Sequence, residues 1–287
     1  MIPKKSLGQH FLRCEWVIST LINTAKIIPE DTILEIGTGE GTLTKALAKT
    51  ATHVIAVEKD ETLAENLLKE IKKEDIQNIS VISGDILKLF PYIKDNMEAK
   101  PPYAGLASIL SSTHFKVVSN IPYYLTSRLF RVLLSGETRP EAIILTIQKE
   151  VAERIVAKSP HMNMLALSIQ AFGTPRIIKE VPASCFWPKP KVDSSIIEIS
   201  DISDNFFVKN NVSEKNFFKL TRLAFNQKRK LLLNSLSTLV DKKELADTLT
   251  KIGLSPKSRP EELSLGEWAE LIRSLSSPIL DRSRGQA

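Results

Sequence analysis

The chain has 287 residues, enough for one large domain or two smaller ones, and its 43% hydrophobic and 25% charged content is that of an ordinary globular protein. No apolar run approaches the roughly 18 residues of a membrane span, and the first residues lack the apolar core of a secretion signal. The net charge of +6 favours a polyanionic partner. We therefore expect a cytoplasmic protein with no membrane contact.

The two cysteines, Cys14 and Cys185, lie far apart in the sequence and belong to no CxxC or Cys/His cluster. In a cytoplasmic protein this pattern is typical of reduced thiols. We predict neither a disulfide nor a metal site.

A basic, glycine-containing arm opens the chain over 3–13, and a helix is predicted over 16–25. Phe11 and Leu12 would be poor choices for a free tail, so we expect the arm to pack near a site. The strand Thr32–Ile36 then leads into the loop Gly37-Thr38-Gly39-Glu40-Gly41 and a predicted helix over 42–49. Backbone N–H groups in such a loop can approach a cofactor closely, although the G-x-G-x-G spacing differs from that of dinucleotide-binding loops.

Two further strands, predicted over 53–58 and 79–83, are each followed or ended by an acid. Glu58 is placed to hold a ribose diol with both carboxylate oxygens; the alternative is a solvated acid at the start of the next helix, predicted over 60–73. Asp85 could accept a hydrogen bond from an adenine amino group or fix a turn after Gly84. Residues 90–113 have weak periodicity and are predicted to form a long loop.

The most informative stretch is the turn Asn120-Ile121-Pro122-Tyr123, which follows a β-branched strand at 117–118. Asn120 supplies a carbonyl acceptor, Pro122 fixes the backbone and Tyr123 offers a flat ring. Together they suit a planar base that carries an exocyclic amine. The alternative is an ordinary hydrophobic turn after a core strand.

From this turn to residue 200, helices are predicted over 127–134 and 150–157, and strands over 142–147, 165–172, 176–181 and 195–199. Prolines on both sides of Lys189 stiffen the loop that carries Phe186 and Trp187. A second stacking wall opposite Tyr123 is assigned to Phe186 more than to Trp187. The alternative is that both are core aromatics.

After residue 200 the β pattern stops. Residues 201–212 are polar and are predicted to be a linker, and helical spacing continues from residue 215 to a last helix over 264–274 and a loose tail. One helical face carries Phe217, Leu220, Ala224 and Leu231, and the opposite face carries Lys215, Lys219, Arg222 and Arg229. No acid occurs between residues 215 and 240, and a stripe of one sign is typical of a surface that follows phosphates.

Several of these motifs stand in the order found in one enzyme family. They are Gln9-His10-Phe11-Leu12, Glu35-Ile36-Gly37-Thr38-Gly39, Glu58, Gly84-Asp85, Asn120-Ile121-Pro122-Tyr123, Gln148-Lys149-Glu150-Val151, Phe186-x-Pro-x-Pro-Lys-Val-Asp-Ser and Phe225-Asn226-Gln227-x-Arg229-Lys230. From residue 4 to about residue 272 the chain thereby resembles the bacterial small-subunit (16S) rRNA adenine N6,N6-dimethyltransferases. The last motif separates this branch from the related large-subunit methylases of erythromycin resistance.

The resemblance implies an α/β, Rossmann-like class I methyltransferase fold with a mixed, mainly parallel seven-stranded sheet and a small all-α C-terminal domain. It implies a methyltransferase domain with its arm over 1–200, a linker over 201–212 and a helical RNA-binding domain over 213–287. The implied cofactor is S-adenosyl-L-methionine, and the implied partner of this monomeric enzyme is small-subunit rRNA within a pre-assembled small ribosomal subunit. The implied reaction is dimethylation of N6 of adjacent adenosines in a hairpin near the 3′ end of that rRNA, during subunit biogenesis.

The resemblance also implies roles for single residues. The cofactor contacts are His10, Leu12, Gly37, Gly39, Glu58, Asp85 and Asn120. The catalytic residues are Asn120, Ile121, Pro122, Tyr123 and Phe186, and the RNA contacts are Lys4, Lys5, Arg222, Lys228, Arg229 and Lys230. The family usually has Asn where this chain has His10, and we expect that imidazole to be neutral beside a bound sulfonium.

Three other functions fit parts of the pattern. A nicotinamide-dependent dehydrogenase would use the glycine loop and Glu58, but the loop spacing and the lack of a histidine suited to hydride transfer argue against it. A non-catalytic RNA-binding assembly factor could keep the fold, although the intact acids and Asn120 favour activity. Methylation of large-subunit rRNA is disfavoured by the resemblance of the C-terminal part alone.

Overall fold

The computed structural model describes residues 3–4, 7–95, 115–135, 138–226 and 230–275, without the side chains of 91–95. They fall into two compact units, Met1–Glu153 with Gly173–Ile202, and Arg154–Phe172 with Ser203–Ala287. The second unit differs from the predicted C-terminal domain, because it includes residues 154–172 from the middle of the chain.

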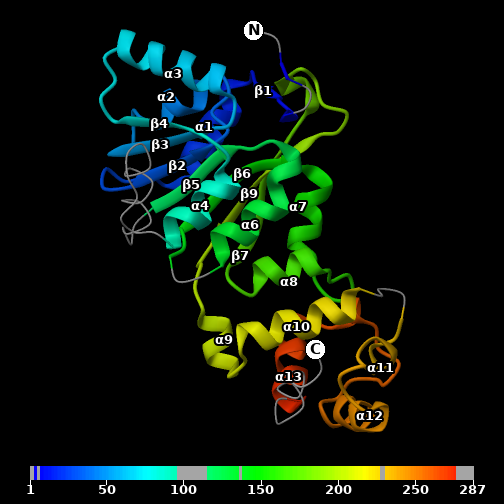
Figure 1. Ribbon diagram of the computed structural model, residues 1–287. Helices are drawn as coiled ribbons and strands as arrows, with labels where there is room; N and C mark the ends of the chain where they lie inside the picture. Colours follow the sequence, from blue (N-terminus) through cyan, green and yellow to red (C-terminus); the bar gives the residue numbers. More distant parts are fainter. Residues whose placement is uncertain (1–2, 5–6, 96–114, 136–137, 227–229, 276–287) are drawn as a thin grey trace. The chain divides into compact units, whose positions relative to one another are not determined.

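The first unit is built on a seven-stranded sheet in the order β4-β3-β2-β5-β6-β9-β7 (Figure 1). The strands are β2 (Thr32–Ile36), β3 (His53–Glu58), β4 (Ile79–Ser83), β5 (Phe115–Asn120), β6 (Ala142–Gln148), β7 (Thr174–Val181) and β9 (Ser194–Ser200). All run parallel except β9, which pairs antiparallel with β6 and with β7. The predicted mixed, mainly parallel seven-stranded sheet is confirmed.

Both faces of this sheet are buried. Ile33, Val54 and Val118 belong to a core cluster with residues of α1 (Glu15–Ala25) and α2 (Thr42–Leu47), and the alternate residues Leu34 and Val117 are buried as well. Strands that are buried on two sides have near-continuous apolar sequences, which is why the patterns of β2, β3, β5 and β6 were readable. The other helices of this unit are α3 (Glu61–Lys73), α4 (Ile86–Asp95) and α6 (Thr126–Leu134), and α7 (Lys149–Val156) begins in this unit and ends in the second (Figure 1).

The order of strands reverses at β2, which has β3 on one side and β5 on the other. In open α/β sheets, ligands bind outside the carboxyl ends of the strands at such a reversal. Gly37 directly follows β2, Glu58 and Asn120 end β3 and β5, and Asp85 lies two residues beyond β4. The topology therefore brings four of the predicted site residues to one edge of the sheet.

The second unit is helical. Its helices are α8 (Met164–Gln170), α9 (Asn205–Asn210), α10 (Glu214–Phe225), α11 (Leu232–Ser235), α12 (Lys242–Lys251) and α13 (Leu265–Leu275). The predicted apolar face of α10 is confirmed for Phe217, Leu220 and Ala224, each of which is fully buried. Leu231 lies beyond the end of α10, so it is not part of that face.

Two predicted elements are wrong, and a third is wrong where the structure describes it. The predicted strand 165–172 is helix α8, whose Asn163 cap accepts hydrogen bonds from the N–H groups of Leu165 and Ala166. The predicted linker contains α9, because Phe207 is buried and its ring lies 5.3 Å from that of Phe172 and 5.7 Å from that of Phe217. The predicted loop 90–113 begins inside α4, and its remainder from residue 96 lies outside the described residues.

The prediction of two reduced thiols is also wrong. The sulfurs of Cys14 and Cys185 form a disulfide, with a Cα–Cα distance of 5.1 Å. The reason is the antiparallel pairing of β1 (Phe11–Leu12) with β8 (Phe186–Trp187), continued by a hydrogen bond from Arg13 N to Cys185 O of 2.8 Å. This pairing brings the two cysteines to neighbouring positions on adjacent strands, one residue out of register, and no local sequence pattern indicates it.

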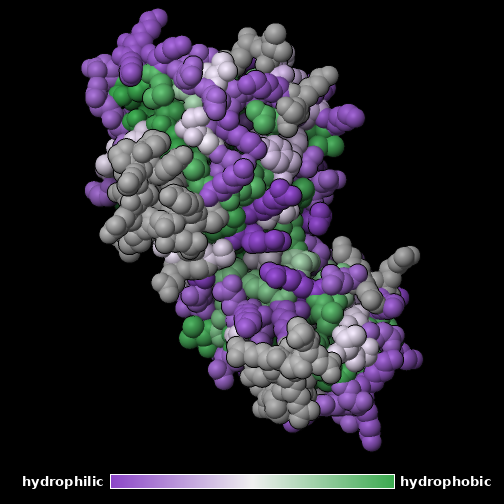
Figure 2. All heavy atoms as spheres, viewed as in Figure 1, coloured by the Kyte–Doolittle hydropathy of each residue, from purple (hydrophilic) through white to green (hydrophobic). Residues whose placement is uncertain are grey.

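Hydrophilic side chains cover most of the face seen in Figure 2, and apolar atoms show between them. Across the described residues, no helix combines the length and the apolar character that a membrane span requires.

Candidate active site

A single pocket collects the predicted cofactor-binding and catalytic residues. At the edge of the sheet, the pocket is lined by Gly37, Gly39, Glu58, Asp85 and Asn120. On the side of strands β1 and β8, it is lined by His10, Leu12 and Phe186. Ile121, Pro122 and Tyr123 line the same pocket. The turn after β5 and the glycine loop after β2 therefore share one open space.

The glycine loop has the backbone that its sequence predicts. Gly37 and Gly39 have φ angles of 79° and 57°, a region that other residues rarely adopt. A Cβ atom on Gly37 would lie 3.2 Å from Pro122 Cδ, and one on Gly39 would lie 3.0 Å from Phe11 Cδ1. The loop thus needs glycine both for its conformation and for its close contact with the Asn120–Tyr123 turn and the arm.

Glu58 is buried, and both of its carboxylate oxygens face backbone N–H groups. Oε2 accepts from Gly39 N at 3.0 Å, and Oε1 accepts from Asp60 N at 2.9 Å. Burial raises the pKa of Glu58 above its usual value, and these two hydrogen bonds oppose the shift. Thr38 Oγ1 also donates to Oε2, at 3.5 Å, so the group is fixed in place and Oε1 can still accept a hydroxyl donor from the pocket.

Glu35 is a second pocket acid, at 1% exposure on β2. Burial raises its pKa from 4.5 to about 8, the nearby Thr44 hydroxyl lowers it in part, and the charge of Glu58 raises it further. In the described part of the chain, no atom lies in hydrogen-bonding position to Glu35 Oε2 or to Thr44 Oγ1. A buried carboxyl with an unpartnered oxygen favours a cationic ligand in this pocket, because a cation would stabilise its charged form.

Asp85 is paired across the pocket edge with Lys59, whose Nζ lies 2.9 Å from Asp85 Oδ2. Asp85 Oδ1 accepts from Leu87 N at 3.1 Å, so the side chain is oriented from within its own loop. Burial alone would raise the pKa of Asp85, but the hydrogen bonds from Lys59 and Leu87 leave it below its usual value. The carboxylate is therefore charged and available as an acceptor for an amino group.

Asn120 connects the sheet edge to the arm. Its Nδ2 donates to His10 O at 3.2 Å, which leaves Oδ1 as the acceptor of this amide. The His10 ring is held in turn, because Nδ1 lies 2.6 Å from Pro188 O and must donate to that carbonyl. Nε2 of His10 is then the ring nitrogen left for a ligand.

The aromatic side chains of the pocket are held differently. Tyr123 is tied through its hydroxyl to Ser194 Oγ at 2.7 Å, and its ring stacks on His10 with a centroid distance of 5.5 Å and an angle of 28°. Burial raises the pKa of the Tyr123 hydroxyl. Phe186 is 4% exposed and packs into the core cluster of the sheet while it lines the pocket. Its role as a stacking wall stays a prediction.

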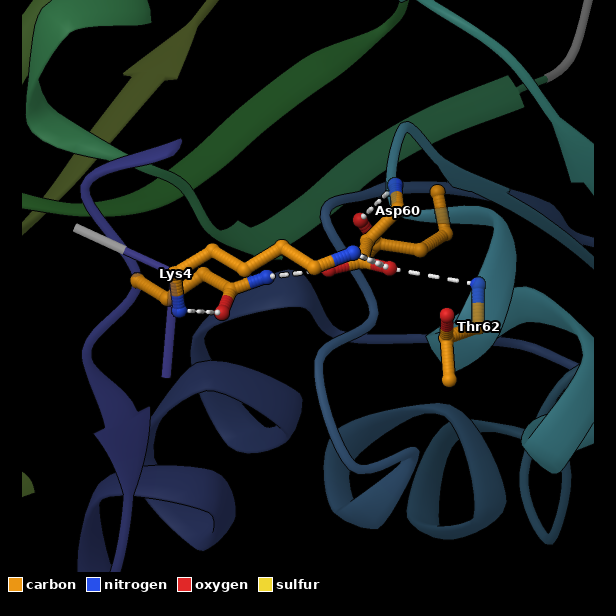
Figure 3. A network of polar contacts seen from close by, with 5 residues as sticks. Lys4, Asp60 and Thr62 are labelled. Atoms are coloured by element: carbon orange, nitrogen blue, oxygen red, sulfur yellow. Dashed lines mark hydrogen bonds and ion pairs between the residues drawn. The ribbon is translucent and has the colours of Figure 1, made fainter. Parts of the chain in front are cut away.

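A polar network fastens the arm over the pocket edge (Figure 3). Asp60 accepts from Lys4 Nζ at 2.8 Å and from Gln9 Nε2 at 3.0 Å, and it also caps α3 through Thr62 N. Burial alone would raise the pKa of Asp60, but the bonds from Lys4 and Gln9 hold it below its usual value. Since Asp60 N also donates to Glu58, one residue joins the arm, the cap of α3 and the pocket acid.

The predicted RNA contacts are only partly described. Lys4 is engaged by Asp60, with its side chain 51% exposed. Arg222 is exposed on α10, with its guanidinium 5.6 Å from the ring of Phe218, and Lys230 is exposed beyond that helix. Lys5, Lys228 and Arg229 lie outside the described residues.

Sequence reasoning assigned no role to Glu35, Lys59, Asp60 or Ser194. A signal existed for Glu35, an acid in an otherwise apolar strand directly before the glycine loop. For Asp60 the helix-cap pattern was visible, but its bonds to Lys4 and Gln9 depend on where the arm packs. Ser194 meets Tyr123 only through the fold.

The chemistry of this pocket fits S-adenosylmethionine. Glu58 can accept from ribose hydroxyls, Asp85 can accept from an adenine amine, and unpartnered Glu35 favours a positively charged ligand. The fold and this set of groups define a Rossmann-like methyltransferase with an α/β catalytic unit.

Comparisons with known proteins agree with this class and narrow it. Residues 3–277 match the family model described as ribosomal RNA adenine dimethylase, and the chain belongs to that family. It is 38% identical over 270 residues to the ribosomal RNA small subunit methyltransferase A of Dehalococcoides mccartyi, covering 93% of this chain and 87% of that protein.

Two solved structures show the same fold. A dimethyladenosine transferase from Plasmodium falciparum superposes with a TM-score of 0.72 at 26% identity, covering 91% of this chain and 96% of that one. The 23S rRNA methyltransferase ErmE superposes with a TM-score of 0.69 at 24% identity, covering 93% and 100%. The fold is therefore shared with a 23S rRNA methyltransferase, whereas the sequence relative named above is a small subunit methyltransferase.

Proposed function

We propose that the protein transfers two methyl groups from S-adenosylmethionine to the exocyclic N6 of each of two adjacent adenosines, in a small-subunit rRNA hairpin near its 3′ end. The single observation that carries this proposal is the shared pocket. The Asn120–Tyr123 turn opens into the same space as Gly37, Glu58 and Asp85, so a base and a cofactor can meet there. Its substrate would be rRNA in a pre-assembled small subunit, met in the cytoplasm by a monomeric enzyme.

S-adenosylmethionine supplies a methyl group activated by a sulfonium. The residues that would hold it are Glu58 at the ribose, Asp85 at the adenine amine and the backbone of Gly37, with His10 and Leu12 closing the pocket. Glu35 would meet positive charge, which explains why a buried acid is tolerated in β2.

The task of Asn120 is to orient the acceptor nitrogen. The lone pair of N6 is delocalised into the adenine ring, so N6 is a poor nucleophile. The Asn120 Oδ1 atom and the backbone carbonyl near Ile121 would accept its N–H groups and turn the lone pair toward the methyl carbon. The bond from Asn120 Nδ2 to His10 O fixes the amide and leaves Oδ1 as its acceptor.

No dedicated general base is required, because the N6 proton becomes acidic only as the new N–C bond forms. This accounts for an amide rather than a carboxylate at residue 120. The base must leave its stack to enter the pocket, where Tyr123 and Phe186 would hold its faces. The His10 ring is stacked on Tyr123 at a centroid distance of 5.5 Å. For the target base to stack on Tyr123, the His10 ring would have to move aside or the base would have to use the part of the Tyr123 ring that His10 leaves uncovered.

The test uses labelled S-adenosylmethionine and purified small subunits from a strain that lacks the modification. We expect label on two adjacent adenosines, with two methyl groups on each, and none on large subunits that lack their own adenine methylation. Label on large-subunit rRNA would favour the alternative substrate. If both subunits stay unlabelled while the protein binds RNA, the non-catalytic assembly factor is favoured instead.

A further inference from the structure

The aromatic residue next to Phe186 is placed for a different task. Successive residues of a strand point to opposite faces, and in β8 Phe186 is buried at 4% exposure while Trp187 is 44% exposed. Among the described residues, Phe186 lines the pocket and Trp187 does not. Trp187 therefore stands outside the pocket, one residue from the proposed wall for the target base.

The indole of Trp187 is held in place by neighbouring groups. The Arg13 guanidinium lies 5.6 Å from the ring centroid, and Glu40 fixes that guanidinium through two contacts of 2.8 and 3.0 Å. The ring of Phe11, which is opposite Trp187 in the β1–β8 pairing, stacks at a centroid distance of 6.3 Å and an angle of 25°. The ring is thus ordered before any ligand binds, although almost half of the residue is exposed.

The charges around Trp187 favour an anionic ligand. Lys189 and Lys191 follow it, both are exposed, and neither has a partner among the described residues. Arg13 is already neutralised by Glu40, so its task is to hold the ring. The next acid along the chain, Asp193, accepts from Ala183 N at 2.8 Å. A flat ring followed by two free ammonium groups matches a nucleotide, which presents a base face and a phosphate.

We propose that Trp187, Lys189 and Lys191 form a subsite for the unpaired nucleotide next to the target adenosine in the RNA strand. The indole stacks on the base of that nucleotide, and the two lysines contact the adjoining phosphates. This inference rests on the proposed function, because it requires an RNA strand at the mouth of the pocket. It adds an RNA contact on the catalytic unit that is separate from the cations of the helical unit.

The first experiment compares Trp187→Phe and Trp187→Leu on small subunits that lack the modification. Stacking on one base is worth roughly a tenfold change in affinity, so we expect Trp187→Leu to raise the KM for subunits about tenfold, with kcat and cofactor affinity unchanged. Trp187→Phe should restore most of the loss, because a phenyl ring still stacks. Ile28→Ala is the matched control, since Ile28 is 52% exposed and lies in the loop before β2, at the opposite edge of the sheet.

The second experiment places a photo-crosslinking amino acid at position 187 and maps the crosslinked nucleotide. We expect the neighbour of the methylated adenosine. Crosslinks to a distant rRNA helix, no crosslinks to RNA, or equal KM values for Trp187→Leu and the wild type would overturn the subsite. These results differ from failure of the proposed function, in which the wild-type protein itself would methylate no small subunits.

Discussion

The two walls of the pocket are held by different kinds of interaction. The sheet wall, made of Gly37, Glu58, Asp85 and Asn120, is placed by parallel strand pairing and by backbone bonds such as Gly37 N to Val57 O at 2.8 Å. The arm wall, made of His10, Phe11, Leu12 and Phe186, is a two-stranded ribbon. It is fastened to the sheet edge through bonds made by Asp60 and Asn120.

This difference assigns the chemical step to the sheet wall and the entry and exit of ligands to the arm. Groups on the sheet wall cannot move without disrupting the core, so they suit tasks that need fixed geometry. Buried Phe11 and Phe186 and the disulfide hold the ribbon itself. The segment before β1 is fastened by only a few side-chain bonds, so this segment can release and re-form at small cost. Changes in the sheet wall should therefore alter turnover or equilibrium affinity, and changes in the fastening of the arm should alter the rates of ligand entry and exit.

The largest expected effect is that of Asn120→Ala. Turnover should fall about a thousandfold, because a preorganised acceptor of the transition state is lost, while cofactor affinity changes little. Methyl transfer and calorimetric cofactor binding measure the two quantities. Asn210→Ala is the control, because Asn210 also donates Nδ2 to a backbone carbonyl but lies in α9. Equal losses of turnover and affinity would assign Asn120 to cofactor binding alone.

Glu58→Ala should act in the opposite way. Loss of a charged acceptor for the ribose should weaken cofactor binding about a hundredfold, with a smaller effect on turnover at saturation. Glu58→Gln should weaken cofactor binding at least as much as Glu58→Ala. Both carboxylate oxygens accept from backbone N–H groups, so in either orientation the glutamine NH2 group would face another N–H donor. Glu61→Ala, at an exposed acid three residues on, controls for charge. Unchanged affinity in calorimetry would refute the ribose role.

Glu35 predicts a pH dependence of the protein without cofactor. Its folded pKa of about 8 lies above the usual 4.5, so the folded protein keeps a proton that the unfolded chain releases between these values. The free energy of unfolding should fall as pH rises through this window, by at most about 1.4 kcal/mol per pH unit. Glu35→Gln should flatten the profile of melting temperature against pH. Binding of a cationic cofactor should make Glu35 of the wild type release its proton. Calorimetry would detect this release as a binding enthalpy that depends on the ionisation enthalpy of the buffer.

Much of the sheet wall could be predicted from the sequence, because its positions follow from strands and the residues that end them. Glu58, Asp85 and Asn120 each stand at or just after the end of an apolar strand, and parallel strands bring such ends together. The arm wall could be anticipated only as an arm that packs near a site. Its partners are side chains far away in sequence, as with Lys4 and Asp60 or Cys14 and Cys185. Local patterns contain no information about such pairs.

The wrong elements have a similar cause. Residues 165–172 are apolar enough for a strand, and only the cap at Asn163 and the packing of the second unit favour a helix. Residues 201–212 are polar on average, but the burial of Phe207 among other phenylalanine rings decides their structure. Tertiary contacts overrode composition in both places.

Release of the arm can be tested with Asp60→Asn. The substitution removes the charge that holds Lys4 while the backbone bond from residue 60 to Glu58 remains. We expect the cofactor dissociation rate to rise between about threefold and tenfold, with a smaller change in turnover, because the Lys4 side chain is half exposed. Lys4→Met should reproduce the effect, and the double variant should add little to it.

The control is Lys45→Met, which removes the exposed pair of Lys45 with Glu70. Unchanged dissociation in both single variants would show that the arm does not govern access.

The smallest expected effect lies outside both walls, at exposed Arg222 and Lys230 of the helical unit. If these cations contact phosphates, each alanine substitution should reduce the slope of log affinity for RNA against log salt by roughly 0.7 to 0.9, since one fewer counterion is released. Arg222→Lys separates the charge of residue 222 from its contact with Phe218: this variant should keep the slope if the charge alone matters.

Lys69→Ala, at an exposed lysine of α3, is the control. Cofactor affinity should stay unchanged in all four variants, because none of these residues lines the pocket. A slope that Arg222→Ala and Lys230→Ala leave unaltered would place the RNA on other surfaces, and the lysines beside Trp187 would then be the next to neutralise.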